Sequence, residues 1–338
     1  MQYYKQGLIL GVLMIITGCA TTPHEKIGRN PAIADKQFHD DFKGKTIKMV
    51  APASGIHPDQ IEALRSFAEL NIQIPDNVIA QDIIFHSVND KKRFQQLKSA
   101  LYDRSVNTII WCLSGGYGSA RLLDKLRTFP IPKKEKVFIG FSDNTALHLF
   151  LSQQWRWKTI HGAALKELLN PHLDPENFLR IADIVAKRVT TQRFSNLIPL
   201  NREAQKEKTI TGRLTGGNLT LIENSLGTHW QIKTAGKILF IEDVNVKGYQ
   251  VDRSLHHLQQ AGILKGVKAI LFGEFTNAPH PEHVTIALER FAEESNIPVY
   301  KTDKFGHGKV NYPLVYNAKA EILPMDNPDE YEMVMHLK

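Results

Sequence analysis

Residues 140–144, Gly-Phe-Ser-Asp-Asn, place a serine between an apolar run and a segment with helical spacing. A serine at a tight turn from a strand into a helix presents its hydroxyl at the carboxyl edge of the sheet, beside free helix N–H groups. This is the arrangement of a nucleophile elbow, although the pattern here is Gly-x-Ser-Asp and not Gly-x-Ser-x-Gly. Ser142 is therefore a candidate nucleophile, and a plain helix N-cap is the alternative that the residues leave open.

A glycine loop follows another apolar run, where residues 115–118 have the sequence Gly-Gly-Tyr-Gly. Adjacent glycines let backbone N–H groups approach a ligand without a Cβ in the way. The spacing matches neither the dinucleotide fingerprint nor a Walker loop, which argues against a phosphate site. We predict an oxyanion hole built from the N–H groups of Gly116 and Asp143, and a simple tight turn is the structural alternative.

A serine nucleophile needs a general base, and the chain offers 14 histidines. His307 stands in residues 305–308, Phe-Gly-His-Gly, a loop in which no apolar face has to be satisfied. An imidazole held on a loop at a strand end is a suitable base. Glu242 ends the apolar run 236–241 and could orient a histidine, or it could be an ordinary acid in a helix-capping turn.

Two other histidine groups invite a metal assignment that we do not make. Residues 280–283, His-Pro-Glu-His, lack the i, i+4 spacing of a zincin helix, and the proline predicts a turn. His256 and His257 are neighbours on a predicted helix. We predict no metal site and no cofactor.

The composition excludes several classes of protein. The 42 Lys+Arg against 35 Asp+Glu give a net charge of +7 over 338 residues, without a basic run or stripe. Nucleic-acid binders concentrate such charge, so we expect no nucleic-acid partner. With 42% apolar and 23% charged residues the chain is not of the disordered type. Cys112, one of 2 cysteines, lies in an apolar run and is predicted to be a small buried residue.

The N-terminus has the features of an export signal. Lys5 precedes an apolar run at 8–16, which is shorter than the about 20 residues that a membrane-spanning helix needs. We therefore predict a signal peptide over residues 1–18. Residues 16–19, Ile-Thr-Gly-Cys, resemble a bacterial lipobox in which Cys19 is lipidated. The alternatives are a wrongly assigned start codon or a buried strand of a cytoplasmic protein.

The expected location follows from this signal. We expect a protein anchored in the cell envelope through Cys19, with residues 19–44 as a polar tether. Ala20 after the cysteine favours the outer membrane, by resemblance to Gram-negative lipoproteins. The location would be cytoplasmic without a signal.

From residue 46 the chain alternates short apolar runs with amphipathic stretches, which is the pattern of an α/β protein. We predict an N-terminal α/β domain with the nucleophile over residues 45–165, an interdomain connection over 166–210 with one helix, and a C-terminal α/β domain with the glutamate and histidine over 211–338. The clearest expected strands are 47–51, 108–113, 137–141, 237–241 and 269–272, and the clearest expected helices are 59–70, 89–102, 144–153, 250–261 and 282–294.

Six ordered blocks of sequence resemble one family, the LD-carboxypeptidases, which are serine peptidases of the S66 type and include the microcin-C self-immunity peptidases. The blocks are 50–54 (Val-Ala-Pro-Ala-Ser), 115–119, 140–145, 212–219 (Gly-Arg-Leu-Thr-Gly-Gly-Asn-Leu), 239–243 with Tyr249, Asp252 and Arg253, and 305–308 with Asn311. The resemblance implies a flavodoxin-like parallel-sheet domain, a smaller C-terminal α/β domain and an active site between them. One departure is Ser114, where relatives commonly have arginine.

The resemblance also implies a mechanism and a substrate. Ser142 would be the nucleophile, His307 its base and Glu242 the group that orients the imidazole. The substrate would be a murein tetrapeptide that loses its terminal D-Ala through an acyl-enzyme. Asn218, Arg213 and Arg253 are the candidates for substrate binding, and a homodimer is left open. The alternatives are hydrolysis of an acylated peptide-nucleotide, as in the immunity branch, and a murein-binding lipoprotein without catalysis.

Overall fold

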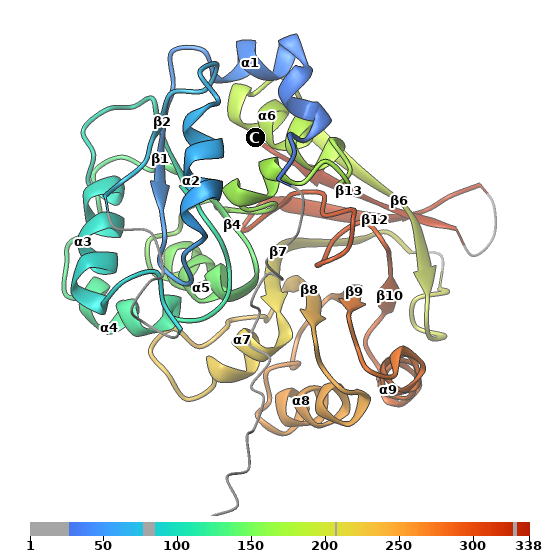
Figure 1. Cartoon of the computed structure of the whole chain (residues 1–338). Helices are drawn as coiled ribbons and strands as arrows, with labels where there is room; N and C mark the ends of the chain where they lie inside the picture. Colours follow the sequence, from blue (N-terminus) through green and yellow to red (C-terminus); the bar gives the residue numbers. More distant parts are fainter. Residues whose placement is uncertain (1–26, 77–84, 207, 327–329) are drawn as a thin grey trace, which may run out of the picture.

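The computed structural model of this chain describes residues 27–76, 85–206, 208–326 and 330–338. The predicted signal peptide and Cys19 lie outside these residues. In the part of the chain that is described, no helix is long and apolar enough to cross a membrane. The described residues form two lobes, each built around its own sheet (Figure 1).

The first lobe contains a mostly parallel six-stranded sheet. Its strands, in spatial order, are β2 (Ile72–Gln73), β1 (Thr46–Val50), β3 (Thr108–Cys112), β4 (Val137–Gly140), β5 (Ile160–His161) and the antiparallel β11 (Leu314–Val315). The first five follow the flavodoxin-like order 2-1-3-4-5, which confirms the predicted fold class. All residues of β3 are buried, as its continuous apolar run predicts for a strand covered on both faces.

Four helices of this lobe arise between its parallel strands: α2 (Pro58–Arg65), α3 (Asp90–Leu101), α4 (Leu123–Leu126) and α5 (Thr145–Gln154). Asn89 caps α3, because its side-chain oxygen accepts a hydrogen bond of 3.0 Å from the N–H of Lys92. Phe94, Leu97 and Leu101 are buried on one face of that helix, as their spacing predicts.

The second lobe is a closed barrel. Its seven strands, in spatial order, are β10 (Val299–Lys301), β6 (Thr191–Pro199), β13 (Tyr331–His336), β12 (Lys319–Pro324), β7 (Ile210–Asn218), β8 (Lys237–Val244) and β9 (Ala269–Thr276). Strands β7, β8, β9 and β10 are parallel, and α7 (Leu219–Asn224), α8 (Gly248–Gln260) and α9 (Pro281–Glu294) connect them. The barrel closes because β10 pairs with both β9 and β6.

The segment that we expected to be an interdomain connection is largely structured. Residues 166–210 contain the predicted helix as α6 (Glu176–Ala186), but they also supply β6, a full strand of the barrel. Along β6 the buried residues Gln192, Phe194 and Leu197 are separated by exposed ones. Such a half-buried strand carries too few apolar residues to stand out in the sequence. Because β6 is a strand of the barrel, the second lobe begins near residue 191 and not at 211.

The prediction of a tether over residues 19–44 is wrong for its described part beyond residue 30. Residues Pro31–Ala34 form a 3-10 helix and Lys36–Phe42 form helix α1, which packs beside α6 (Figure 1). Phe38 is fully buried, and the ring of Phe42 stacks on Trp111 at 5.8 Å between centroids. These few large apolar side chains are enough to dock the segment on the first lobe.

Strand β11 crosses from one lobe to the other. Leu314 and Val315 pair with His161 and Ile160 at the edge of the first sheet, although they follow most of the barrel in the sequence. The predicted domain boundary at residue 211 is therefore not a clean division of the chain.

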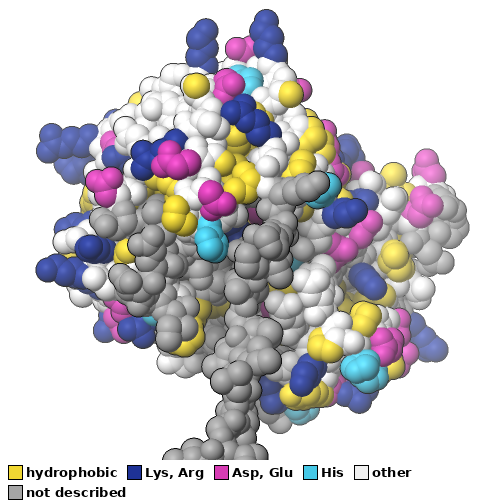
Figure 2. Space-filling view, in the orientation of Figure 1, with side chains coloured by type: hydrophobic (Ala, Val, Ile, Leu, Met, Phe, Trp, Pro, Cys, Tyr) yellow, Lys and Arg dark blue, Asp and Glu magenta, His cyan; other side chains and the backbone are white. Residues whose placement is uncertain are grey.

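Charged side chains of both signs are interspersed over the face shown in Figure 2, where Lys and Arg lie among Asp and Glu. On this face the Lys and Arg side chains are spread out and do not gather into one area.

Candidate active site

Ser142 occupies a strained turn between β4 and α5. Its φ is +59°, in the left-handed region, and a 3-10 turn, Ser142–Asn144, leads from it into the helix. A helix N-cap has an extended backbone, so the N-cap alternative does not describe this serine. A non-glycine residue held in this region costs on the order of 1 kcal/mol and is typical of functional turns. The geometry is therefore that of a nucleophile elbow.

The glycine loop passes directly beside this serine. A Cβ on Gly115 would lie 2.8 Å from the Cβ and 2.9 Å from the Oγ of Ser142, so a side chain has no space there. Gly116 has a φ of +105°, and a Cβ on it would lie 2.0 Å from the Oγ of Ser54. Both glycines are required by close approach, Gly115 to Ser142 and Gly116 to Ser54.

Two buried polar side chains join the elbow to the glycine loop. The carboxylate of Asp143 accepts a hydrogen bond of 2.8 Å from the N–H of Ser119. Asn144 donates to the carbonyl oxygens of Ser114, at 3.1 Å, and Phe141, at 3.0 Å. Burial raises the pKa of Asp143, while the N–H groups of this loop lower it. These hydrogen bonds hold the elbow against the residues on either side of the glycine loop, Ser114 and Ser119.

Glu242 and His307 are in direct contact, as their proposed roles require. His307 Nδ1 lies 2.5 Å from Glu242 Oε2, and the side chains are 14% and 0% exposed. The ladder between β8 and β9 shifts register between Ile241 and Asp243, so Glu242 sits at a bulge. Bulges redirect side chains at strand ends, and here the bulge directs Glu242 to the histidine.

The same contact changes the titration of His307. Burial lowers the pKa of an imidazole, but the charge of Glu242 and its hydrogen bond act in the opposite sense and prevail. The pKa of His307 is raised above its ordinary value. By contrast, burial lowers the pKa of His148 to about 4, and this imidazole is held by the hydroxyl of Thr159 and the carbonyl of Gly140. His148 is therefore a neutral core residue.

Ser142 and His307 line one cavity of about 800 Å³ between the lobes. The ring of Phe141 lies 4.8 Å from the ring of His307, which brings the elbow close to the histidine. In the described residues there is no hydrogen bond between Ser142 and His307. Catalytic hydrogen bonds are often long before substrate binds, so this geometry is compatible with a serine–histidine pair.

Two adjacent glycines of β7 allow close contacts, Gly216 with the neighbouring strand β8 and Gly217 with helix α5 of the first lobe. A Cβ on Gly216 would lie 1.8 Å from the carbonyl oxygen of Phe240, and one on Gly217 would lie 2.5 Å from Thr145 Oγ1. The Thr145 hydroxyl accepts a hydrogen bond of 3.1 Å from the N–H of Asn218. Tyr316 donates to the carbonyl of Gly216 at 2.7 Å. The barrel is thus docked on the first turn of the helix that follows Ser142.

The three residues predicted to bind substrate separate into two groups. Asn218 lines the cavity, caps α7 and donates a hydrogen bond of 2.8 Å to Asp243. Arg213 is exposed and donates to the carbonyl of Asn317, and Arg253 lies over the ring of Tyr249 on α8. Neither arginine lines the cavity. Both arginines belong to sequence blocks that also contain cavity residues, but their own side chains are exposed on the barrel and lie outside the cavity lining.

Sequence reasoning missed Lys166, which is the only Lys or Arg among the described residues lining the cavity. Its N–H donates to the carbonyl of Leu113 at 3.1 Å, which holds it beside the glycine loop. Glu167 also lines the cavity, and burial raises the pKa of its carboxyl. A Lys-Glu pair in an irregular polar segment carries no local pattern, so only the fold could reveal these residues.

The fold and the residue types gathered in this cavity are those of a two-lobed hydrolase. Residues 47–162 match the LD-carboxypeptidase N-terminal domain, and residues 211–322 match the LD-carboxypeptidase C-terminal domain. The chain belongs to the LD-carboxypeptidase family, peptidase family S66, as the six sequence blocks predict.

Relatives of known sequence agree with this family. The chain is 46% identical over 295 residues to a putative carboxypeptidase of Rickettsia conorii, covering 87% of this chain and 92% of that protein. It is 31% identical over 287 residues to a probable murein peptide carboxypeptidase of Bacillus subtilis, covering 82% and 88% of the two chains.

Solved structures share the fold. A muramoyltetrapeptide carboxypeptidase from Oxalobacter formigenes superimposes with a TM-score of 0.72 at 22% identity, over 86% of this chain and 99% of that one. An MccF-like protein from Bacillus anthracis gives a TM-score of 0.71 at 21% identity, over 87% and 98% of the two chains. The two-lobed architecture is therefore that of the family.

Glu242→Gln is expected to lower the pKa of His307, because the desolvation remains while the opposing charge is removed. NMR titration of the labelled imidazole measures this change directly. A raised folded-state pKa contributes stability that is present below the unfolded pKa and lost as the pH rises through the folded pKa. The stability difference between wild type and variant should therefore be larger at acidic than at alkaline pH.

Glu321→Gln is the matched control, since Glu321 contacts His336 at 3.3 Å on strands β12 and β13 of the barrel, away from β8 and His307. The titration of His307 should be the same in this control as in the wild type. An unchanged His307 pKa in Glu242→Gln would contradict the assigned contact.

Proposed function

We propose that the protein is a serine-type LD-carboxypeptidase that hydrolyses the amide bond between the L-centre of diaminopimelate and the terminal D-Ala of murein tetrapeptides. The observation that carries this proposal is the Glu242–His307 contact in the cavity that also contains the strained Ser142. The names of the Bacillus subtilis relative and of the Oxalobacter formigenes structure support the murein substrate class.

In the proposed reaction His307 Nε2 takes the proton of Ser142 Oγ while this oxygen attacks the scissile carbonyl carbon. The Nδ1–H of the imidazole donates to Glu242, whose carboxylate stabilises the positive charge that forms on the ring. The N–H groups of Gly116 and Asp143 receive the oxyanion. His307 then protonates the nitrogen of D-Ala, which leaves as a free amino acid, and water hydrolyses the acyl-enzyme by the same route.

The division of these residues between the lobes matters for this mechanism. Ser142 belongs to the first lobe, whereas Glu242 and His307 belong to the barrel. Because Ser142 and His307 are not hydrogen-bonded before substrate binds, the proposal requires a small approach of the two side chains when the cavity is filled. Gly306, with a φ of +134°, gives the histidine loop a backbone that can make this adjustment.

Ser142→Ala is expected to reduce release of D-Ala from murein tetrapeptide by at least about 10⁴-fold, the scale seen when a catalytic serine is removed. Mass spectrometry of the digest would follow the tetrapeptide, the tripeptide and D-Ala. Ser152→Ala is the control, because Ser152 lies on the same helix α5 but donates only to the carbonyl of Leu149. Undiminished release by Ser142→Ala would refute the proposed nucleophile.

We further propose that Lys166 binds the carboxylate of the terminal D-Ala. A carboxypeptidase has to recognise a free carboxylate next to the bond that it cuts, and a paired cation provides this recognition. Lys166 meets the requirement because it lines the cavity beside the glycine loop. It would supply the positive charge that is absent at Ser114, where relatives commonly have arginine.

Lys166→Met is expected to lower kcat/KM for tetrapeptide by about 10- to 100-fold, as the loss of a charged hydrogen bond predicts. The effect should appear mainly in KM, since the carboxylate is bound equally in the ground and transition states. Lys166→Arg should keep most of the activity. Lys309→Met is the control, because this exposed lysine lies outside the cavity lining; a KM equal to wild type in Lys166→Met would exclude the assignment.

A second candidate function is hydrolysis of acylated peptide-nucleotides, as in the microcin-C immunity branch. The likeness to the MccF-like protein of Bacillus anthracis favours it. A peptide-nucleotide probe, in which an amide bond joins the acyl group to the adenylate, distinguishes the two functions in the same digest. Cleavage of this probe without cleavage of tetrapeptide would favour the second function, and tetrapeptide binding without any cleavage would favour a murein-binding lipoprotein.

We also propose that Cys19 is lipidated and holds the protein at the cell envelope, at the outer membrane if the source is Gram-negative. The support is the short apolar run behind Lys5 and the lipobox-like sequence at residues 16–19. Metabolic labelling with a fatty acid should mark the wild-type chain and leave Cys19→Ala unlabelled. Equal labelling of both, or a wild-type chain found only in the cytoplasm, would refute the anchor.

A further inference from the structure

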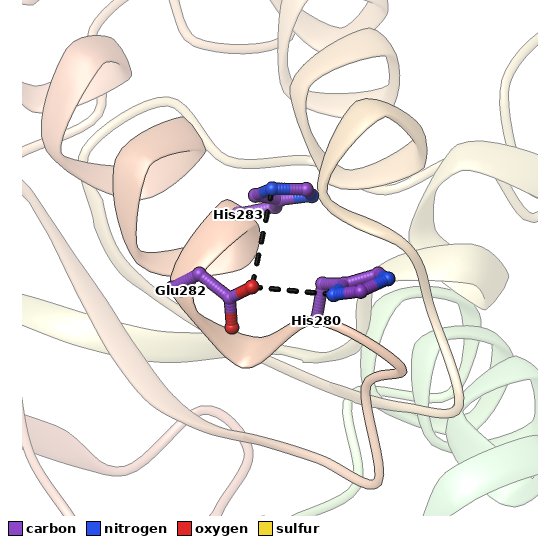
Figure 3. A group of neighbouring side chains, drawn as sticks. All are labelled: His280, Glu282 and His283. Carbon is purple, nitrogen blue, oxygen red and sulfur yellow. Dashed lines mark hydrogen bonds and ion pairs between the residues drawn. The ribbon is translucent and has the colours of Figure 1, made fainter.

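Outside the active cavity, three potential metal ligands converge at the N-terminus of α9. His280 directly precedes the helix, and Glu282 and His283 lie in its first turn. Both imidazoles turn a nitrogen toward the same carboxylate oxygen, Glu282 Oε1, as Figure 3 shows. His280 Nδ1 is 3.2 Å and His283 Nε2 is 3.9 Å from this oxygen. All three ligand atoms lie within 4.8 Å of one another.

These separations suit a tetrahedral zinc ion. Ligand atoms held at 2.0–2.2 Å from zinc lie roughly 3.3 Å apart, close to the distances in this cluster. Two imidazoles and a carboxylate form a donor set that zinc accepts readily, whereas magnesium prefers oxygen ligands alone. We propose that His280, Glu282 and His283 bind a zinc ion whose fourth position is open to water or to a ligand.

The cluster is exposed, but its backbone is held from behind. A Cβ on Gly248 would lie 2.6 Å from the backbone carbonyl and the Cβ of His283, so the start of α8 packs directly on this residue. An ion pair between Arg290 and Asp252 joins the same two helices further along. The backbone at His283 is therefore held in place, and adjustment onto a metal is left to the side chains.

The open side of the cluster faces a second cavity of about 560 Å³, which His280 and His283 line together with Tyr249 and Lys247. A metal here would be reachable from solvent, and its free position would face an aromatic ring and an ammonium group. A carboxylate or other small anion is the kind of ligand that such a position accepts.

Two local charges act against a cation. The N-terminus of α9 carries a partial positive charge, and Lys247 lines the adjoining cavity. Arg290 adds little, because Asp252 pairs with it. Since the cluster is exposed, water and salt screen these charges. The two positive charges weaken the binding of zinc, but they do not outweigh direct bonds from the metal to three ligands.

The spacing rule for zinc-binding helices missed this site for a geometric reason. That rule requires two histidines one turn apart on a helix, at i and i+4. Here His280 lies outside the helix with an extended-type backbone, at φ −137° and ψ 84°. The turn made by Pro281 folds this side chain back over Glu282 and His283, which a helical pattern cannot represent.

The proposed metal would also affect one wall of the active cavity. Asn277, with a φ of +54°, lines the active cavity and stands at the start of the loop that ends at His280. The loop before α8 is shared in the same way, because Asn245 lines the active cavity and Lys247 lines the second cavity. Zinc held by His280 would therefore restrain a loop that lines the active cavity.

Isothermal titration of the full-length, chelator-treated protein with zinc tests the proposal. The wild type should bind zinc and should not bind magnesium. His283→Ala and Glu282→Gln should each weaken this binding by at least about tenfold, because each removes one of three ligands. His256→Ala is the matched control, an exposed histidine on α8 outside the cluster, and it should bind zinc as the wild type does.

Circular dichroism of the metal-free variants shows whether they remain folded, and Glu282→Gln keeps the size of the side chain. Zinc binding of equal affinity in the wild type and both cluster variants would overturn the proposal, since the ion would then be held elsewhere. A wild type without measurable zinc binding would also overturn it. Neither result depends on peptidase activity, so the test is independent of the proposed function.

Discussion

The close approach of β7 to helix α5 is the constraint on which the rest of the site depends. Gly217 allows it, because a side chain there would overlap Thr145, while Gly216 lets β7 lie against Phe240 of the neighbouring strand β8. The approach brings β8, the neighbour of β7, to the elbow, and with it the carboxylate that contacts His307. Distance between two lobes is thereby set by backbone contact, which varies far less than contacts between long side chains.

A second requirement is the burial of a carboxylate at the end of β8. Removing Glu242 from water is unfavourable unless a partner compensates, and His307 provides the partner. The adjacent Asp243 is accommodated differently: burial raises its pKa, whereas hydrogen bonds donated by Asn218, Thr220 and the N–H of Val244 lower it. The bulge separates the tasks of the two acids, since one positions the histidine and the other ties the start of α7 to the strand.

The sequence predicted local structure and local chemistry well. The continuous apolar runs located β1, β3, β4 and β8, and Asn89 located the start of α3. Glycines around Ser142 and His307 indicated turns that the backbone indeed makes. Each of these signals depends on residues that are close in the sequence. The family resemblance added the roles that these residues would have in one site.

What could not be predicted depends on contacts between distant segments. Closure of the barrel rests on the pairing of β6 with β10, which are separated in the sequence by β7, β8, β9 and their helices. Lys166 lies at the cavity because its backbone N–H is bound to the carbonyl of Leu113. Arg213 lies outside the cavity because the alternation of side chains along β7 turns it outward. The docking of α1 rests on three aromatic rings, too few to distinguish a docked helix from a polar segment.

Strand β11 has a consequence for how the molecule is made. The edge of β5 that faces away from β4 stays unpaired until residues 314 and 315 have been synthesised, after most strands of the barrel. An unpaired edge attracts other strands, so incomplete chains are exposed to misassembly during this interval. The arrangement also couples the two lobes in time, because a chain that stops before residue 314 can form neither the finished first sheet nor the closed barrel.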